Sequence, residues 1–210
     1  RPTAVGRRGR QTRVVSAVIL APVALAGARH LVGQGAKAMI ERGFAQAGEP
    51  LPPDRVPALF DRFIEIYIGR IAQDSLAFED LDVTLDLLAQ EGAALAICTN
   101  KRTDLSMALL DALDLTRRFS AVIGPDRAPA PKPDPRHLLA AIQAAGGDPA
   151  RALMVGDSIS DVLAARAADV PVAVVSFGYT ETPAAELGGD VLIDHFTELP
   201  AIARRLLARP

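Results

Sequence analysis

The chain has 210 residues, of which half are apolar, and a formal net charge of −2. A chain of this size and composition can bury a full hydrophobic core, so we expect one main domain with a modest insertion. The only basic cluster lies near residue 1 and has no interleaved aromatic residues, which argues against a nucleic-acid partner. The single cysteine excludes an internal disulfide and favours a reducing, cytoplasmic compartment.

Residues 1–30 differ in composition from the rest of the chain. Arginines precede a largely apolar run over residues 14–28, and the first acidic residue of the whole chain is Glu41. The apolar run is shorter than the roughly 20 residues that a membrane-spanning helix needs, so no membrane partner is expected. Three interpretations remain: a secretory signal, an acid-poor transit peptide, or translation in a wrong frame or from a wrong start.

Residues 31–78 have a helical pattern. Apolar side chains recur every three to four residues, and a proline-rich loop over residues 48–53 separates two helical stretches, of which the second runs to residue 77. The segment Gly33-Gln34-Gly35-Ala36-Lys37 favours a glycine-permitted turn over an anion site. A small, incomplete α-helical unit is therefore expected here.

From residue 79 to 210, helices alternate with short apolar strands. The expected helices cover residues 81–91, 103–114, 135–146, 160–169 and 197–208, and the expected strands cover 94–98, 120–123, 152–156, 172–176 and 190–193. This alternation predicts an α/β fold with a doubly wound parallel sheet, covered by helices on both faces. Right-handed crossovers place the carboxyl ends of all strands at one edge, where such folds bind ligands.

Two polar segments near strand ends have the chemistry of an anion site. Thr99 and Asn100 follow the strand at 94–98 and lie just before a helix, whose first N–H groups favour anions. Lys132 lies in the loop Lys132-Pro133-Asp134-Pro135, where the prolines restrict the backbone. A lysine held in this way can act as a point charge on a phosphate.

Asp157 and Asp161 lie at the turn between the strand at 152–156 and the following helix. Two carboxylates on one turn suit a small oxygen-preferring cation such as Mg²⁺. A purely structural interpretation has similar weight at this point: Asp157 begins the turn, Ser160 caps the helix, and Asp161 favours its N-terminal dipole.

The other chemically interesting side chains favour structural roles. Cys98 ends a buried strand and is interpreted as a small core residue. His137 is expected on a helix surface and His195 in a turn. Asp126 is a weaker metal candidate, and Lys101 either adds positive potential to the anion site or is a solvated residue at a helix start.

In this order, Thr99-Asn100, the Lys132 loop and the turn from Gly156 to Asp161 resemble motifs two to four of the haloacid dehalogenase (HAD) superfamily. Residues 174–180 and 193–196 are similar to its phosphoglycolate phosphatase branch. The resemblance implies a HAD-like, Rossmann-like core at 79–210 and a small α-helical cap at 31–78. It also implies that Thr99, Asn100 and Lys132 bind phosphate, that Lys132 is catalytic, and that Asp157 and Asp161 hold Mg²⁺.

The first motif of that superfamily, Asp-x-Asp-Gly-Thr, is absent from this chain. An alignment that takes residues 17–20 as the first strand puts Ala21 at the nucleophile position and Val23 at the acid/base position. Neither side chain can do this chemistry, so we expect impaired catalysis. Since the missing motif belongs in this segment, we favour a wrong frame or start for residues 1–30 over a targeting segment.

The leading functional hypothesis is Mg²⁺-dependent hydrolysis of a small phosphate monoester such as 2-phosphoglycolate, a substrate named from the resemblance alone. A haloacid dehalogenase is the alternative enzyme, less favoured because Thr99 and the two aspartates suit a phosphate and a metal. The contrasting class is a non-catalytic phosphate- or partner-binding relic of the fold. The expected partner is a small-molecule phosphate ester, and a homodimer is left open.

Overall fold

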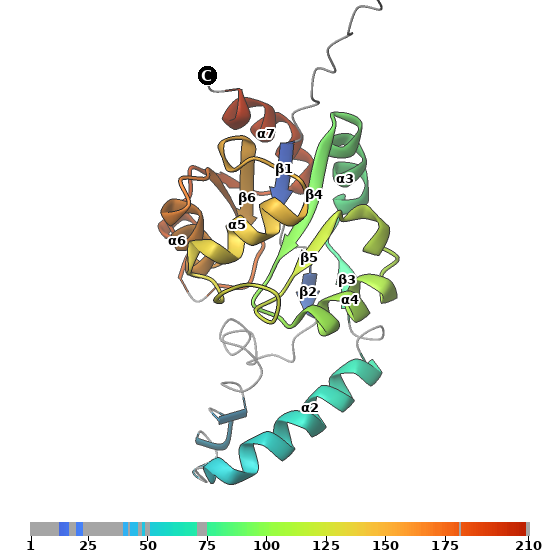
Figure 1. Ribbon diagram of the computed structural model, residues 1–210, viewed down its shortest axis with the longest axis vertical. Coiled ribbons are helices and arrows are strands. Elements are labelled where there is room, and N and C mark those ends of the chain that lie inside the picture. Colours follow the sequence, from blue (N-terminus) through green and yellow to red (C-terminus); the bar gives the residue numbers. More distant parts are fainter. Residues whose placement is uncertain are drawn as a thin grey trace, which may run out of the picture.

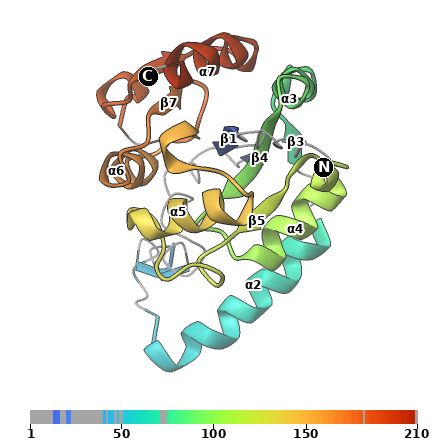
Figure 2. The same ribbon diagram turned by 45° about the horizontal axis from the view of Figure 1, so that its top comes forward.

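The computed structural model describes residues 13–16, 20–22, 40–41, 43–45, 48, 51–70, 75–180 and 182–208. These residues contain a six-stranded sheet in the order β5-β4-β1-β6-β7-β8, with every neighbouring pair parallel, and a separate two-stranded ribbon (Figure 1). Helices cover both faces of the large sheet (Figure 2). The predicted α/β class with a doubly wound parallel sheet is confirmed.

Most predicted elements lie within two residues of their observed bounds. The sheet consists of β1 (Arg13–Ser16), β4 (Ala93–Cys98), β5 (Ala121–Ile123), β6 (Ala152–Gly156), β7 (Val172–Val175) and β8 (Val191–Ile193). The covering helices are α3 (Leu81–Gln90), α4 (Thr103–Ala112), α5 (Pro135–Ala144), α6 (Ile159–Ala167) and α7 (Leu199–Leu207). Helix α7 starts later than predicted because a short 3-10 turn, η6 (Phe196–Glu198), precedes it.

Alternating side chains of the central strands build a core on each face of the sheet. Leu153 and Val155 of β6 join the core that includes apolar residues of α3 and α7. Ala152 and Met154 of the same strand join the core that includes residues of α5 and α6. This period of two, with both faces apolar, is what a buried parallel strand requires.

The first strand differs from the sequence-based expectation. The described strand between β4 and β6 is β1, whose Ser16 pairs with Ala96 of β4 and Met154 of β6, while residues 17–19 of the expected strand at 17–20 lie outside the described residues. Ala21 lies instead in β2 (Leu20–Pro22), where it pairs with Leu76 of the antiparallel strand β3 (Ser75–Ala77). The apolar run at 14–28 has no clear period, so the sequence could not fix which of its residues enter the sheet.

The segment 31–78 is only partly as expected. The predicted second helix is present as α2 (Val56–Arg70), preceded by the short turn η2 (Pro53–Arg55). Residues 75–77, expected to continue a helix, form β3 instead, because they pair with β2. The segment 33–37 and residue 23 lie outside the described residues, and the division of the chain at residues 30 and 78 stays a prediction.

Candidate functional site

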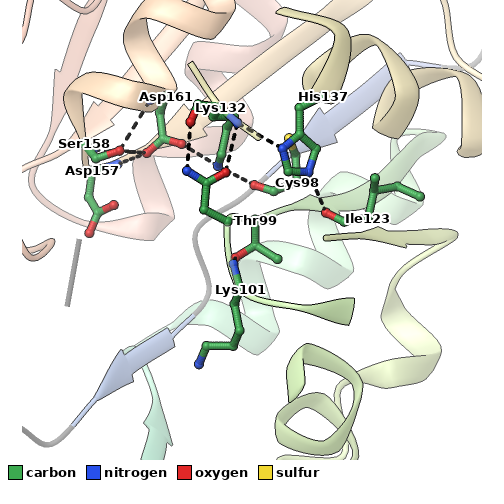
Figure 3. Close-up of polar contacts among 10 residues, drawn as sticks. Cys98, Thr99, Lys101, Ile123, Lys132, His137, Asp157, Ser158 and Asp161 are labelled. Carbon is green, nitrogen blue, oxygen red and sulfur yellow. Dashed lines mark hydrogen bonds and ion pairs between the residues drawn. The ribbon is translucent and has the colours of Figure 1, made fainter. Parts of the chain in front are cut away.

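Three segments that are far apart in the sequence meet at one place. Thr99 and Asn100 follow β4, Lys132 lies in the loop between β5 and α5, and Asp157 follows β6. Hydrogen bonds connect Asn100 to Lys132, and Lys132 to Asp161 at the start of α6 (Figure 3). The predicted convergence of these segments at the carboxyl ends of parallel strands is therefore present.

The side chain of Asn100 makes two hydrogen bonds with the main chain of Lys132. Its Nδ2 donates to the carbonyl oxygen of Lys132, and its Oδ1 accepts from the Lys132 N–H, each at 2.9 Å. Thr99 lies beside it, with its hydroxyl oxygen accepting from the N–H of Lys101 at 3.1 Å. Asn100 therefore holds the lysine loop in place, a role that the sequence did not indicate.

Lys132 is almost completely buried, with 7% of its surface exposed. Its Nζ donates to the carbonyl oxygen of Cys98 at 2.5 Å and to Oδ1 of Asp161 at 2.6 Å. Burial alone lowers the pKa of this amine, but the neighbouring Asp161 carboxylate, together with Cys98 and Asp157, holds the pKa above its ordinary value. Because an ammonium has three N–H donors, one of them is left over from these two contacts.

His137 is fully buried, so its predicted place on a helix surface is wrong. Its Nδ1 accepts from the N–H of Lys132 at 3.1 Å, and its Nε2 lies 3.1 Å from the carbonyl oxygen of Ile123. The first contact leaves Nδ1 unprotonated, so Nε2 carries the hydrogen and donates it to Ile123. His137 thus supports the lysine loop through its imidazole ring, and burial lowers the pKa of His137.

Asp161 and Ser158 form a capping box at the start of α6. Oδ2 of Asp161 accepts from the N–H and hydroxyl of Ser158 and, at 3.2 Å, from the N–H of Asp157. Ser158, not Ser160, is therefore the N-cap, since the helix begins one residue earlier than expected. Both carboxylate oxygens of Asp161 are already bound by groups of the protein.

The carboxylate of Asp157 points away from Asp161 (Figure 3). Its Oδ2 accepts from the N–H of Tyr179 at 2.8 Å, and among the described residues no other residue donates to Oδ1. Partial burial raises the pKa of Asp157 above its ordinary value. An anionic oxygen without a protein partner is a suitable ligand for a hard cation.

Three glycines allow close contacts around these side chains. A Cβ at Gly156 would lie 2.4 Å from Cβ of Asp161, and one at Gly178 would lie 2.1 Å from Cβ of Asp157. A Cβ at Gly124 would lie 2.6 Å from the N–H nitrogen of Thr103. The sequence-based prediction missed Gly124 and Gly178, although Gly124 directly follows the buried strand β5, where a glycine is a signal of close approach.

The remaining candidates have structural partners. Asp126 accepts from the N–H and hydroxyl of Thr103, and these hydrogen bonds at the start of α4 lower its pKa. Cys98 is buried, as expected, and burial raises the pKa of its thiol to about 11. His195 precedes the turn η6, as predicted.

The described part of the chain contains no cluster of three or more His, Cys, Asp or Glu side chains that could hold a metal ion. Asp157 and Asp161 therefore have no third carboxylate beside them in these residues. A search of the same residues for a helix long and apolar enough to cross a membrane finds none.

Comparison with known proteins identifies the family of this chain. Residues 19–175 match the family model described as haloacid dehalogenase-like hydrolase. The chain is 51% identical to a phosphoglycolate phosphatase of Caulobacter vibrioides over 90% of this chain and 79% of that protein. It is 46% identical to a phosphoglycolate phosphatase of Agrobacterium fabrum, over 93% of this chain and 84% of that protein.

A solved structure has the same fold. It is the crystal structure of a predicted phosphoglycolate phosphatase from Haemophilus somnus, with a TM-score of 0.76 and 28% sequence identity. The match covers 81% of this chain and 78% of that one. The predicted resemblance to these hydrolases is confirmed.

Proposed function

This chain belongs to the haloacid dehalogenase-like hydrolases, and we propose that its site binds a small phosphate monoester, with 2-phosphoglycolate as the substrate. The observation that carries the proposal is the buried Lys132, whose ammonium is held at the carboxyl edge of the sheet beside Thr99 and Asp157. The names of the Caulobacter and Agrobacterium relatives support the choice of substrate.

In this proposal Lys132 neutralises the charge of the phosphoryl group. Its third N–H is available for a phosphate oxygen, and a charge-assisted hydrogen bond of this kind is about twice as strong as a neutral one. The Thr99 hydroxyl can donate to the same anion, since its oxygen already accepts from Lys101. Asn100 acts indirectly, by fixing the main chain of Lys132.

Asp157 is the proposed first ligand of Mg²⁺. The chemistry of the donors fits this ion, because an unshared carboxylate oxygen suits a hard cation that keeps most of its waters. Bound there, Mg²⁺ would supply charge stabilisation to the phosphoryl oxygens. Asp161, whose two oxygens are occupied, supports the site by orienting Lys132 and the turn at Asp157.

We also propose that this chain hydrolyses its substrate slowly. The sequence after Ser16 continues Ala17, Val18, Ile19, and no carboxylate occurs before Glu41. A phosphatase of this kind needs a nucleophilic Asp near the end of the strand between β4 and β6, and this chain has none there. Binding without turnover, as in a non-catalytic relic, is therefore the second candidate function.

A dehalogenase is less well supported. The site has a buried ammonium and an unshared carboxylate oxygen, which fit a phosphate and a cation better than an alkyl halide.

The single buried cysteine and the enzyme class of the relatives support a cytoplasmic location as part of the same proposal.

The experiment that tests the proposal is phosphate release from 2-phosphoglycolate with Mg²⁺. It compares the parent chain with a variant in which Asp-x-Asp-Gly-Thr directly follows Ser16. We expect little release by the parent and Mg²⁺-dependent release by the variant, abolished by Lys132→Ala. Fast hydrolysis of a haloacid by the variant, or Mg²⁺-dependent release that survives Lys132→Ala, would contradict it.

A further inference from the structure

Four aromatic rings gather beside the site. The ring of Phe78 lies 5.1 Å from that of Phe177, 5.8 Å from that of Phe196 and 6.5 Å from that of Tyr179, measured between centroids. Phe177 and Phe196 are 5.0 Å apart, and Phe196 belongs to the buried core on the α3 and α7 face. The edge-to-face pairs among these rings have the geometry that aromatic side chains prefer.

The turn that carries two of these rings contacts Asp157 twice. Gly178 lies between Phe177 and Tyr179, and its Cα is so close to Asp157 that a Cβ there would be 2.1 Å from Cβ of the aspartate. The N–H of Tyr179 donates to Oδ2 of Asp157 at 2.8 Å. One contact limits where the carboxylate can move, and the other fixes its rotation.

Phe78 connects this turn to a different part of the chain. It directly follows β3, which pairs with β2, and it precedes α3 by only a few residues. Its ring touches both residues that flank Gly178, through Phe177 on one side and Tyr179 on the other. Movement of Phe78 would therefore be transmitted to the turn that holds Asp157.

We propose that Gly178 and Phe78 are positioning residues for Asp157. The turn at 177–179, held by the ring of Phe78, sets the direction of the Asp157 carboxylate so that its Oδ1 faces a divalent cation. This inference rests on the proposed function, because it takes Asp157 as the ligand of Mg²⁺. It goes beyond that function by placing part of the control of metal affinity in residues that never touch the ion.

Supporting residues of this kind change metal affinity by roughly 10–100-fold in other metalloproteins. We therefore expect Phe78→Ala and Gly178→Ala each to weaken Mg²⁺ binding within that range. The probe is MgCl₂ titrated into the ¹⁵N-labelled chain, followed by the amide shift of Tyr179, which is bonded directly to Asp157. Circular dichroism melts give the unfolding temperature of each variant. Each titration is then run well below that temperature.

Two controls separate positioning from general loss of packing. Phe119→Ala removes a ring that packs on the same core as Phe78. Phe119 lies just before β5, at the other end of the sheet from the turn at 177–179. The substitution should lower stability and leave Mg²⁺ affinity unchanged. Gly69→Ala adds a methyl group to α2 where nothing lies within 4 Å, so it should leave Mg²⁺ affinity unchanged and, since alanine favours a helix over glycine, should not lower stability.

The outcomes distinguish this inference from the proposed function. If Mg²⁺ does not shift the Tyr179 amide in the parent, or shifts it equally in Asp157→Asn, Asp157 is not the ligand and the proposed function fails. If the parent binds Mg²⁺ through Asp157 and Phe78→Ala binds it as tightly, only the positioning role is overturned. Phe78→Ala decides the matter even if Gly178→Ala does not fold.

Discussion

Nζ of Lys132 and Oδ1 of Asp161 are 2.6 Å apart, and the two side chains are only 5% and 3% exposed. This buried ion pair connects the loop before α5 to the first turn of α6. A buried pair costs much desolvation energy, which its members recover only when each keeps its partner. The pair is therefore both a structural link and the means by which a positive charge is kept at the site.

Replacing Lys132 by methionine should destabilise the fold strongly. The substitution keeps most of the side-chain length but leaves the Asp161 carboxylate buried without its counter-ion. We expect the free energy of unfolding to fall by about 3–5 kcal/mol, measured by urea denaturation. Arg136→Met is the matched control, because it breaks an exposed ion pair with Asp134 and should cost far less stability than Lys132→Met. Equal losses in the two variants would contradict the role of burial.

Asn100→Ala tests the pair of hydrogen bonds that fixes the lysine loop. It removes two hydrogen bonds to the main chain of Lys132, each of which contributes about 0.5–1.5 kcal/mol, so the stability should fall by about 1–3 kcal/mol. Vanadate affinity, measured by calorimetry, should fall as well, because Lys132 is no longer held in place. A loss of stability with unchanged vanadate affinity would reduce Asn100 to a structural residue.

The buried imidazole of His137 should make the stability of the fold depend on pH. Burial lowers its pKa in the folded state, whereas in the unfolded chain it has its ordinary value of about 6.5. Between these two values the unfolded state binds more protons, so this contribution to stability is complete above about pH 6.5 and is lost as the pH falls towards the folded pKa. The slope from one group is at most about 1.4 kcal/mol per pH unit.

Urea denaturation from pH 5 to 8 measures this dependence. His137→Gln should be less stable than the parent but should lose the part of the slope that lies below about pH 6.5. His195→Gln is the control, since it leaves the buried imidazole in place and should keep the slope of the parent. A parent-like slope in His137→Gln would show that other groups cause the acid sensitivity.

Mg²⁺ should bind weakly and through Asp157. The described residues offer no third carboxylate near Asp157 and Asp161, and Mg²⁺ gives up its waters reluctantly. Asp157→Asn should abolish binding in a calorimetric titration, and Asp126→Asn should leave it unchanged because Asp126 accepts from Thr103 instead. Tight binding by the parent, or its loss in Asp126→Asn, would reveal a different ligand set.

The sequence predicted the α/β core well because its signals are local. Uninterrupted apolar stretches such as Ala152–Gly156 and the helical spacing within Pro135–Ala144 identify each element without knowledge of its neighbours. The choice of Thr99, Lys132 and Asp157 as neighbours followed from the rule that parallel strands end at one edge. The roles of these residues in binding stay predictions.

The contacts of the site could not be predicted in the same way. Asn100 and Lys132 are far apart in the sequence, so nothing local shows that one brackets the other. His137 has ordinary helical neighbours, and only the packing of α5 on the sheet explains its burial. Strands β2 and β3 form because they pair with each other, a long-range condition that overrides the helical pattern before residue 77.

The central claim is that one site at the carboxyl edge of the sheet receives a phosphoryl group between Thr99, Lys132 and Asp157. A titration of inorganic phosphate into the ¹⁵N-labelled chain, with MgCl₂ present, tests it most directly. The account predicts that the amide shifts concentrate at residues 99–101, 132 and 157–158 and disappear in Asp157→Asn/Thr99→Val. Shifts concentrated elsewhere, or unchanged in that double variant, would contradict it.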